Sequence, residues 1–422
     1  MNGIRFYAPY LIVLPILLIC IFRKINFDQF ILIFLLYFFS QIIGSLTNEY
    51  YENIRLENYY LAFNSIIFLS SLNILKEYNF EKILFVFKIA SLILSCYLTI
   101  YLGHSYIKFL NTDYQIYMYG QKDFYNTAIL GNTLPHVTGL ARVVAFFLIY
   151  LFVSFYTSKK NKKLKLFLLM LLFFFLWGLQ SRSAILLITI SLLIFIFLYN
   201  RTKIISSILL LVTLFLGAAF LWDQNYFLKS KIYLHLNNEI IIESTFKKNR
   251  FIQSIKRHKF LKNKSTSQKN KYHDVNDSPI TSGRSIIWKR IIDTYDTSKF
   301  FGYGVQGDRF ILKKLNNQNT SYGSNASNSL LYAFSSGGYL SLITFILINL
   351  IFLKELITSY RLREKFKTNK ERKFSQFISI LILFIMGRSL IENSHAYFGI
   401  DFLLICISFY LLRSLNVIAQ KS

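Results

Sequence analysis

Residues 165–199 read KLFLLMLLFFFLWGLQSRSAILLITISLLIFIFLY, two apolar runs separated by a short turn that contains Arg182. A bilayer core about 30 Å thick needs roughly 20 helical residues to cross it. Because backbone polar groups in lipid must be paired within the segment, each run is predicted to be a membrane-spanning helix. The stretch therefore predicts two spans, 165–180 and 183–199, with an arginine in the hairpin between them.

The rest of the chain repeats this pattern. Its 422 residues are 54% hydrophobic and only 16% charged, whereas a soluble domain carries about 25% charged residues. The apolar runs predict an all-α fold, a polytopic transmembrane helix bundle of about 11 or 12 spans. The first run lacks a following small-residue cleavage site and is interpreted as a retained span. The predicted spans are 6–22, 27–46, 59–75, 82–103, 140–157, 165–180, 183–199, 204–222, 327–353, 374–391 and 396–413.

Lysine and arginine are concentrated in one set of short loops, which the positive-inside rule assigns to the cytoplasm. The opposite loops, of which the longest is 223–326, are then extracytoplasmic. The predicted organisation is an N-terminal bundle of about eight spans (1–222), a large extracytoplasmic loop with short helices (223–326), C-terminal transmembrane helices (327–413) and a cytoplasmic tail (414–422).

The net charge of +27 would suggest nucleic acid as a partner of a soluble protein. Here the excess of lysine and arginine in the short cytoplasmic loops accounts for most of the net charge, so no nucleic-acid partner is predicted. A dense basic stretch at 247–271 has two open interpretations. It is either a flexible solvated loop or an electrostatic funnel for anionic lipid headgroups or a charged glycan. The cysteines lie in apolar runs without metal-ligand or CxxC spacing, so neither a disulfide nor a metal site is predicted.

Four arginines are expected near ends of apolar helices on the extracytoplasmic side: Arg142, Arg182, Arg284 and Arg388. A guanidinium at that depth is costly unless it has a partner. Guanidinium groups bind phosphate bidentately and keep their charge. We interpret the four as a binding site for the diphosphate of a lipid-linked sugar, where they would stabilise the departing diphosphate. The alternative is that they form structural pairs with nearby carboxylates between helices.

Carboxylates are scarce near the predicted spans, which makes the last hairpin informative. Glu392 and His395 are three residues apart and would share a face of a continuous helix, so either is a candidate base for a sugar hydroxyl. Asp401 lies inside an apolar run and requires a partner. The alternative for Glu392 is a structural pair with Arg388 at i,i+4 spacing.

Four segments stand in order around the large loop. They are QSRSA (180–184), SGRSIIW followed by FGYG (282–288 and 301–304), NASNSLLYAFSSGGYL (325–340) and RSLIENSHAYFGID (388–401). Together they resemble the O-antigen polymerase and ligase superfamily of bacterial membrane glycosyltransferases. Each segment alone is only a weak indication of the family, and the stronger evidence is that all four occur in the same order around one large loop.

The resemblance implies a chain-extending glycosyl transfer at the periplasmic side of the bacterial inner membrane. The donor would be a glycan on polyprenyl diphosphate, and the acceptor another lipid-linked repeat unit. No metal or cofactor would be needed, and the sequence has no P-loop or dinucleotide-binding fingerprint. Membrane lipid is an expected partner, and a chain-length regulator is a further candidate. Trp288, Tyr303 and Asn328 are predicted to bind the glycan, although an interfacial aromatic belt would also account for tyrosines on the outer loops.

One departure bears on the choice within the superfamily. Ligases of this group carry a histidine where this chain has Ser327. This favours a polymerase, and the alternatives are a ligase-type glycan transferase or a transporter or flippase of lipid-linked oligosaccharide. A transporter would more often show paired halves with broken helices at the membrane midplane.

Overall fold

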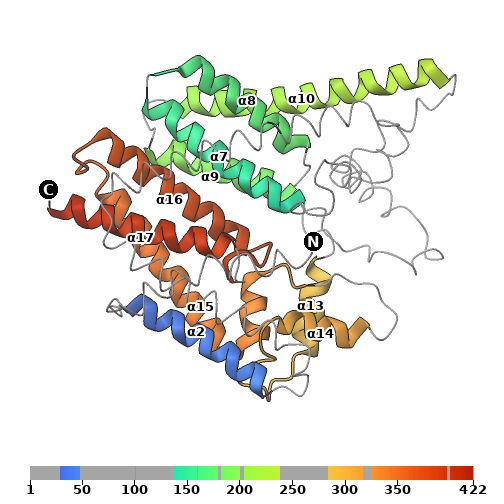
Figure 1. Ribbon diagram of the computed structural model, residues 1–422, viewed down its shortest axis with the longest axis vertical. Helices are drawn as coiled ribbons and strands as arrows, with labels where there is room; N and C mark the ends of the chain where they lie inside the picture. The colour runs from blue at the N-terminus through green and yellow to red at the C-terminus, as the bar shows by residue number, and fades with distance from the viewer. Residues whose placement is uncertain are drawn as a thin grey trace. The chain divides into compact units, whose positions relative to one another are not determined.

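The structure, a computed structural model, describes residues 29–47, 100, 137–158, 160–178, 182–199, 204–237, 284–316, 325–396 and 400–421. Every element in these ranges is a helix, as the all-α prediction requires (Figure 1). The chain divides into two compact units, which are described separately: residues 1–78 with 281–422, the C-terminal unit, and residues 79–280, the central unit. The spans predicted at 6–22 and 59–75, and all of the span predicted at 82–103 except residue 100, lie outside the described residues.

Four apolar helices lie in the described residues of the central unit. Helices α7 and α8 contact each other, and α9 and α10 pack on this pair. Large apolar side chains such as Phe152 and Phe195 are fully buried between them. Helix α10 continues well beyond residue 222, where the predicted span ends. The bounds are Val137–Thr157 (α7), Lys162–Gly178 (α8), Arg182–Tyr199 (α9) and Ile204–Asn237 (α10).

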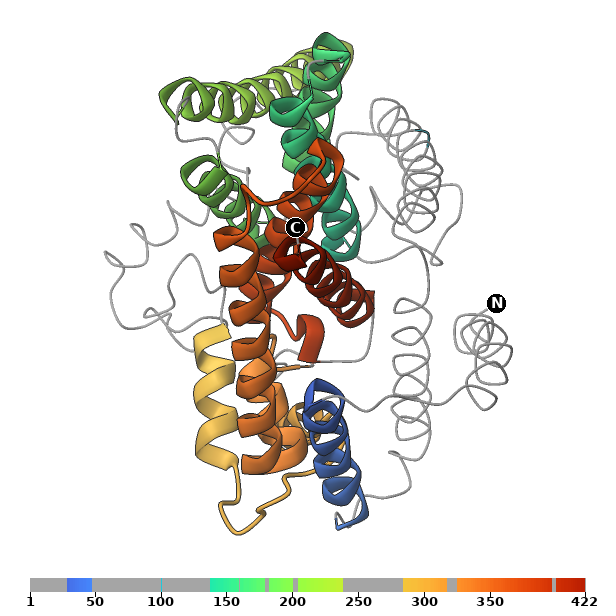
Figure 2. The same ribbon diagram turned by 90° about the vertical axis from the view of Figure 1, so that its left-hand side faces the viewer.

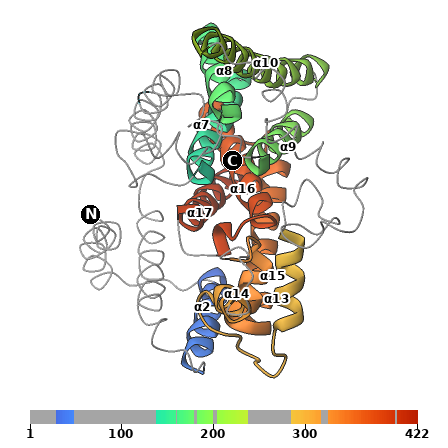
Figure 3. The ribbon, with the colours of Figure 1, turned by 90° about the vertical axis from the view of Figure 1, so that its right-hand side faces the viewer.

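The C-terminal unit is organised around one long helix, α15. Helix α2 runs along α15, and α16 and α17 pack on the same helix (Figures 1 and 2). The short helices α13 and α14 lie beside the first half of α15 (Figures 2 and 3), within the predicted large loop. The bounds are Gln29–Leu46 (α2), Arg284–Thr294 (α13), Gly307–Asn316 (α14), Ser329–Arg361 (α15), Asn369–Ser389 (α16), Ser394–Ala396 (η4) and Ile400–Lys421 (α17).

Aromatic rings fill the contact between α2, α15 and α17. The ring centroid of Phe30 on α2 lies 4.3 Å from that of Phe409 on α17 and 5.6 Å from that of Phe352 on α15. Phe34, one turn further along α2, has its ring 5.1 Å from that of Phe402. Burial of such rings contributes more to stability than their area alone suggests, because tilted and edge-on pairs attract each other.

Three helices in the described part of the chain are long and apolar enough to cross a membrane: Gln29–Leu46, Ser329–Arg361 and Leu404–Lys421. Shorter apolar helices lie at Ala141–Thr157, Ser183–Tyr199 and Ile204–Ala218. These helices indicate that the chain is a membrane protein, and the total of about 11 spans stays a prediction. Helix α17 extends through residues 414–421, which were assigned to a cytoplasmic tail.

Helix α15 is broken in its first half, and a loop segment fills the break. The break falls at Gly337 and Gly338, which have non-helical backbone angles, and Gly338 has a left-handed φ of 65°. The backbone N–H groups of Tyr303 and Gly304 donate to the carbonyls of the two serines at 335 and 336, at 2.8 Å each. Gly302 also has a left-handed φ, and a Cβ placed on it would lie 2.6 Å from the amide nitrogen of Gly338. Gly302 and Gly338 therefore allow the loop to pair with carbonyls that the broken helix leaves free.

Candidate functional site

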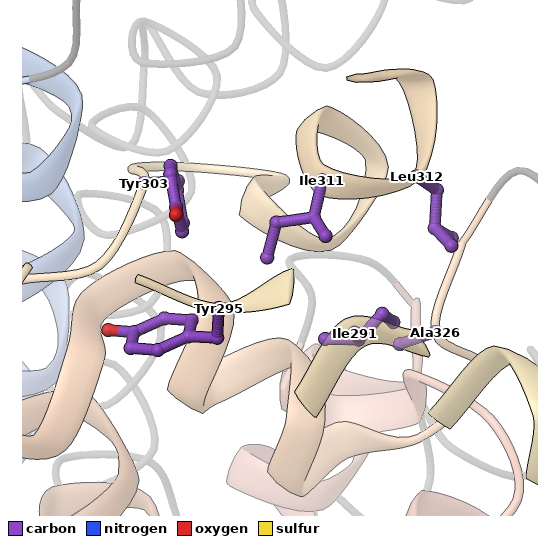
Figure 4. Packing of buried hydrophobic residues seen from close by; sticks show 6 residues of the cluster. All are labelled: Ile291, Tyr295, Tyr303, Ile311, Leu312 and Ala326. Atoms are coloured by element: carbon purple, nitrogen blue, oxygen red, sulfur yellow. The ribbon is translucent and has the colours of Figure 1, made fainter. Parts of the chain in front are cut away.

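A small apolar core holds the two loop helices in place. The hydroxyl of Tyr303 accepts a hydrogen bond from the backbone N–H of Asp296 at 3.1 Å, and its ring meets that of Tyr295 edge-on. Tyr295 also packs on Phe334 of α15, with ring centroids 4.1 Å apart. These contacts fix α13 and α14 against the first half of α15. The buried members of this loop core, drawn in Figure 4, are Ile291, Tyr295, Tyr303, Ile311, Leu312 and Ala326.

Polar side chains tie the loop helices to the segment that enters α15. The indole N–H of Trp288 donates to the carbonyl of Ala326 at 2.7 Å. The carboxylate of Asp308 on α14 accepts from the backbone N–H of Ala326 at 2.7 Å and from the amide of Asn393 at 3.3 Å. Burial raises the pKa of Asp308, and these hydrogen bonds oppose that shift. Asp308 thus links the loop to the turn that follows α16.

The start of α15 is fastened to the same turn. Asn328 caps the helix, since its side-chain oxygen accepts from the backbone N–H of Leu331 at 3.0 Å. Its side-chain N–H₂ group donates to the carbonyl of Leu390, and its backbone N–H donates to the side chain of Asn393, both at 3.0 Å. The hydroxyl of Ser329 donates to the carbonyl of Asn393 at 2.8 Å. The predicted glycan-binding residue Asn328 therefore already has an architectural role.

A charged cluster lies at the end of α16. Arg388, only 2% exposed, forms an i,i+4 ion pair with Glu392, the structural alternative that their spacing offered. Its Nε atom also lies 3.6 Å from the carboxylate of Asp401 on α17, which accepts a hydrogen bond from the hydroxyl of Ser394 at 2.9 Å. Asp401 therefore has the partner that its place in an apolar run requires. We call Arg388, Glu392 and Asp401 the ion-pair cluster.

Arg284, the first residue of α13, interacts with the same cluster. Burial lowers the pKa of its guanidinium, and the carboxylate of Glu392 opposes this shift by raising the pKa. Glu392 thus forms an ion pair with Arg388, and its charge also acts on Arg284, about 100 residues away in sequence. The structure brings together three of the predicted site residues.

His395 occupies a different environment. It is 1% exposed, its Nε2 atom lies 3.1 Å from the side-chain oxygen of Asn349, and its ring packs on Phe345. Burial lowers the pKa of His395 to about 4, so the ring is neutral at neutral pH. A general base must come within hydrogen-bond reach of the proton that it accepts, and the burial of this ring between Asn349 and Phe345 keeps it from a substrate. Of the two candidate bases, Glu392, whose side chain is 16% exposed, is the better placed.

Arg142 and Arg182 belong to the central unit, where Arg182 begins α9 and Arg142 lies in the first turns of α7. Whether they meet Arg284 and Arg388 on one diphosphate is untested and stays a prediction. Tyr303 lies inside the loop core, a placement that favours packing over its predicted stacking on sugars. Within the described ranges, no group of three or more His, Cys, Asp or Glu side chains is arranged to hold a metal ion.

Sequence reasoning did not single out Asp308, Ser329 or Asn393. The sequence holds only slight indications of two of them: Asp308 is an acidic residue in a strongly basic loop, and Asn393 directly follows the candidate base Glu392. Their importance comes from hydrogen bonds across 63 to 85 positions of sequence, which no local pattern reveals.

Part of the chain matches the model of a known protein family. Residues 166–346, somewhat less than half of the 422-residue chain, match the family model described as O-antigen ligase. This confirms the resemblance over that part of the chain and indicates glycan processing of the O-antigen ligase or polymerase type. The matched range includes Arg182, Arg284 and the break in α15, and it ends before the ion-pair cluster. No curated protein and no solved structure matches the chain.

Proposed function

We propose that this chain, which belongs over residues 166–346 to the O-antigen polymerase and ligase superfamily, polymerises a surface polysaccharide. The donor is a growing glycan on polyprenyl diphosphate, and the acceptor is another lipid-linked repeat unit. The transfer takes place at the extracytoplasmic face of the bacterial inner membrane.

The observation that supports this proposal is the convergence of three family-like segments in the C-terminal unit. The segments 282–304, 325–340 and 388–401 are joined by hydrogen bonds from Trp288 to Ala326 and from Asn328 to Leu390. Their meeting point holds two guanidinium groups and a partly exposed carboxylate, Glu392. These are the groups that a metal-independent transfer from a diphosphate donor needs.

In the proposed reaction, Arg284 and Arg388 hold the donor's diphosphate through charge-assisted hydrogen bonds. Glu392 accepts the proton of the acceptor hydroxyl as its oxygen attacks the anomeric carbon of the donor sugar. The bond between that carbon and the diphosphate oxygen breaks, and the electron pair leaves with the diphosphate. Arg142 and Arg182 are proposed to complete the diphosphate site.

A glycan ligase is the second candidate, favoured by the description of the matched family as O-antigen ligase. Ser327 favours the polymerase, because ligases of the superfamily carry a histidine there. Ser327 has a left-handed φ of 48°, and its hydroxyl donates to the side-chain oxygen of Asn325 at 2.7 Å. It thus stabilises the turn before α15 and supplies no imidazole.

Deletion of the gene distinguishes the two candidates. Loss of a polymerase should leave single repeat units on the lipid acceptor in place of a ladder of long chains. Loss of a ligase should instead remove the surface glycan while free long polymer accumulates. Electrophoresis of the extracted surface glycan separates these outcomes.

The arginine site is tested by complementing the deletion strain. We expect Arg284→Ala and Arg182→Ala to abolish the ladder, and Arg284→Lys to restore it only partly, because an ammonium group cannot reproduce the guanidinium fork. Arg361→Ala, at an exposed position in the last turn of α15, is the matched control and should leave the ladder intact. Unchanged chain length in both alanine variants would remove the diphosphate role. Purified protein should also extend a synthetic lipid-diphosphate repeat unit without added nucleotide sugar.

A further inference from the structure

The two carboxylates that pair with Arg388 differ in how firmly they are held. The side chain of Asp401 is 3% exposed, stands in the first turn of α17 and accepts a hydrogen bond from Ser394. The side chain of Glu392 is 16% exposed and stands in the turn after α16 ends at Ser389. Burial and the helical backbone restrain Asp401 more strongly than Glu392, so Glu392 is the carboxylate that can leave at lower cost.

Glu392 also has the second arginine as a neighbour. Its carboxylate interacts electrostatically with Arg284 as well as forming the ion pair with Arg388. A diphosphate carries more negative charge than one carboxylate and offers more acceptor oxygens to the guanidinium forks. A diphosphate that approaches these two arginines therefore competes directly with Glu392.

We propose that Glu392 is an exchangeable counter-ion of Arg388, which the donor's diphosphate displaces from Arg388 with the help of the charge on Arg284 and thereby frees to act as the base. Asp401 is the permanent counter-ion, a positioning residue that keeps Arg388 in place when Glu392 leaves. This inference rests on the proposed function and adds an order of events: the donor binds before the acceptor hydroxyl can lose its proton.

The exchange balances charge and atoms at each step. Before the donor binds, Glu392 and Asp401 offset the charge of Arg388, and the charge of Glu392 also acts on Arg284. The donor's diphosphate then takes over the guanidinium group of Arg388 from Glu392. The freed carboxylate accepts the acceptor's hydroxyl proton as the new carbon–oxygen bond forms and the diphosphate departs. Loss of the diphosphate carrier and of the proton returns Glu392 to its ion pair.

The test measures binding of geranylgeranyl diphosphate to the purified full-length chain in detergent. Glu392→Gln removes the competitor and should bind this probe about five- to tenfold more tightly than the unaltered chain. Asp401→Asn removes the permanent counter-ion and should bind it more weakly. Each substitution removes one negative charge, so a general electrostatic effect would shift both affinities in the same direction.

Two further variants keep the test decisive. Ser394→Ala loosens Asp401 without removing its charge and should weaken binding by about two- to fivefold. Glu364→Gln, in an exposed ion pair at the other end of α16, is the matched control and should bind like the unaltered chain. Thermal unfolding of each variant identifies any loss that comes from misfolding.

The expected pattern has a kinetic counterpart. Glu392→Gln should extend lipid-linked repeat units at least about 100-fold more slowly despite binding the diphosphate probe more tightly. Equal or weaker binding of the probe by Glu392→Gln would overturn the exchange while leaving the proposed function intact. If neither the unaltered chain nor any variant binds the probe, the proposed function itself fails, and the exchange fails with it.

Discussion

Helix α16 has arginine–glutamate pairs near both of its ends, and the two ends differ in burial. Before its first turn, Glu364 lies within ion-pair distance of Arg363 and Arg372, and the side chain of Glu364 is 66% exposed. At its last turn, the side chain of Arg388 is 3% exposed in its pair with Glu392. Exposed pairs contribute about 0–1 kcal/mol, whereas removing one partner of a buried pair costs about 3–5 kcal/mol. The same kind of arginine–glutamate pair therefore contributes differently to the free energy of unfolding at the two ends of α16.

The two ends also differ in where their partners come from. At the exposed end, Thr368 and Glu371 form a capping box within three residues of each other. At the buried end, Arg388 depends on Asp401 from α17, and the adjoining Asn393 reaches Asp308 on α14. A change at the exposed end should stay local, and a change at the buried end should spread to the loop helices.

The largest effect is expected from Arg388→Ala. It leaves the buried carboxylate of Asp401 and the partly exposed carboxylate of Glu392 without their guanidinium, so the free energy of unfolding should fall by about 3–5 kcal/mol. Arg372→Ala, on the same helix but with a 41% exposed side chain, should change it by less than about 0.5 kcal/mol. Chemical unfolding of both variants in detergent measures the difference. Equal losses in the two variants would contradict the contrast between the ends.

The second effect concerns the break in α15, which holds the loop beside the buried end. Gly338→Ala places a methyl group against the backbone carbonyl of Phe300 at a left-handed φ, and should cost about 2–3 kcal/mol. Gly217→Ala on α10 is the control, because its Cβ would meet only the end of Met170 at an ordinary 3.6 Å. That variant should be neutral or slightly more stable. Thermal unfolding compares the pair, and a neutral Gly338→Ala would show that the loop does not need this junction.

The third effect is a pH dependence at the buried end. The pKa of His395 is lowered to about 4 by burial, whereas in the unfolded chain it is about 6.5. As the pH falls, the unfolded chain therefore binds the proton before the folded chain does. The contribution of neutral His395 to the free energy of unfolding is present above pH 6.5 and is lost as the pH drops toward 4. The loss should be on the order of 2 kcal/mol by pH 4.5.

His395→Gln isolates this contribution, because glutamine cannot take up the proton. Thermal unfolding between pH 7.5 and 4.5 should show a shallower decline in the variant than in the unaltered chain. Parallel declines would mean that other groups cause the acid sensitivity.

The smallest effect is expected from Glu364→Gln at the exposed end. Its pairs with Arg363 and Arg372 are solvated and easily screened by salt, so the free energy of unfolding should change by less than about 0.5 kcal/mol. Unfolding at low and high salt measures it. A loss comparable to that of Arg388→Ala would erase the contrast between the two ends.

Several features of this molecule were predictable from local patterns. Apolar runs predicted the helices at 27–46, 140–157 and 183–199 to within a few residues, because helix length and apolar content follow from the bilayer. The i,i+4 spacing indicated the pair of Arg388 and Glu392 as the alternative to a catalytic Glu392, because such residues lie on one face of a helix. The extension of α10 beyond 222 was missed, because its polar second half lacks the apolar signal.

The placement of His395 and Tyr303 was not predictable in the same way. Both carry side chains that suit a substrate site, and both lie buried among aromatic rings contributed by other segments. Whether a polar side chain faces a substrate or a packed interior depends on neighbours far away in sequence. The roles of Asp308 and Asn393 were hidden for the same reason.

By itself, the sequence determined that the described chain is helical and apolar, and which motifs carry the family resemblance, because helix formation and membrane partition depend on residues close together. Only the tertiary structure decided that Glu392 pairs with Arg388 and also acts on Arg284, and that Asp401 is the better-buried counter-ion. The interaction energy of two charges decreases with the distance between them and depends on how deeply they are buried. These are properties of the folded chain that the order of residues does not state.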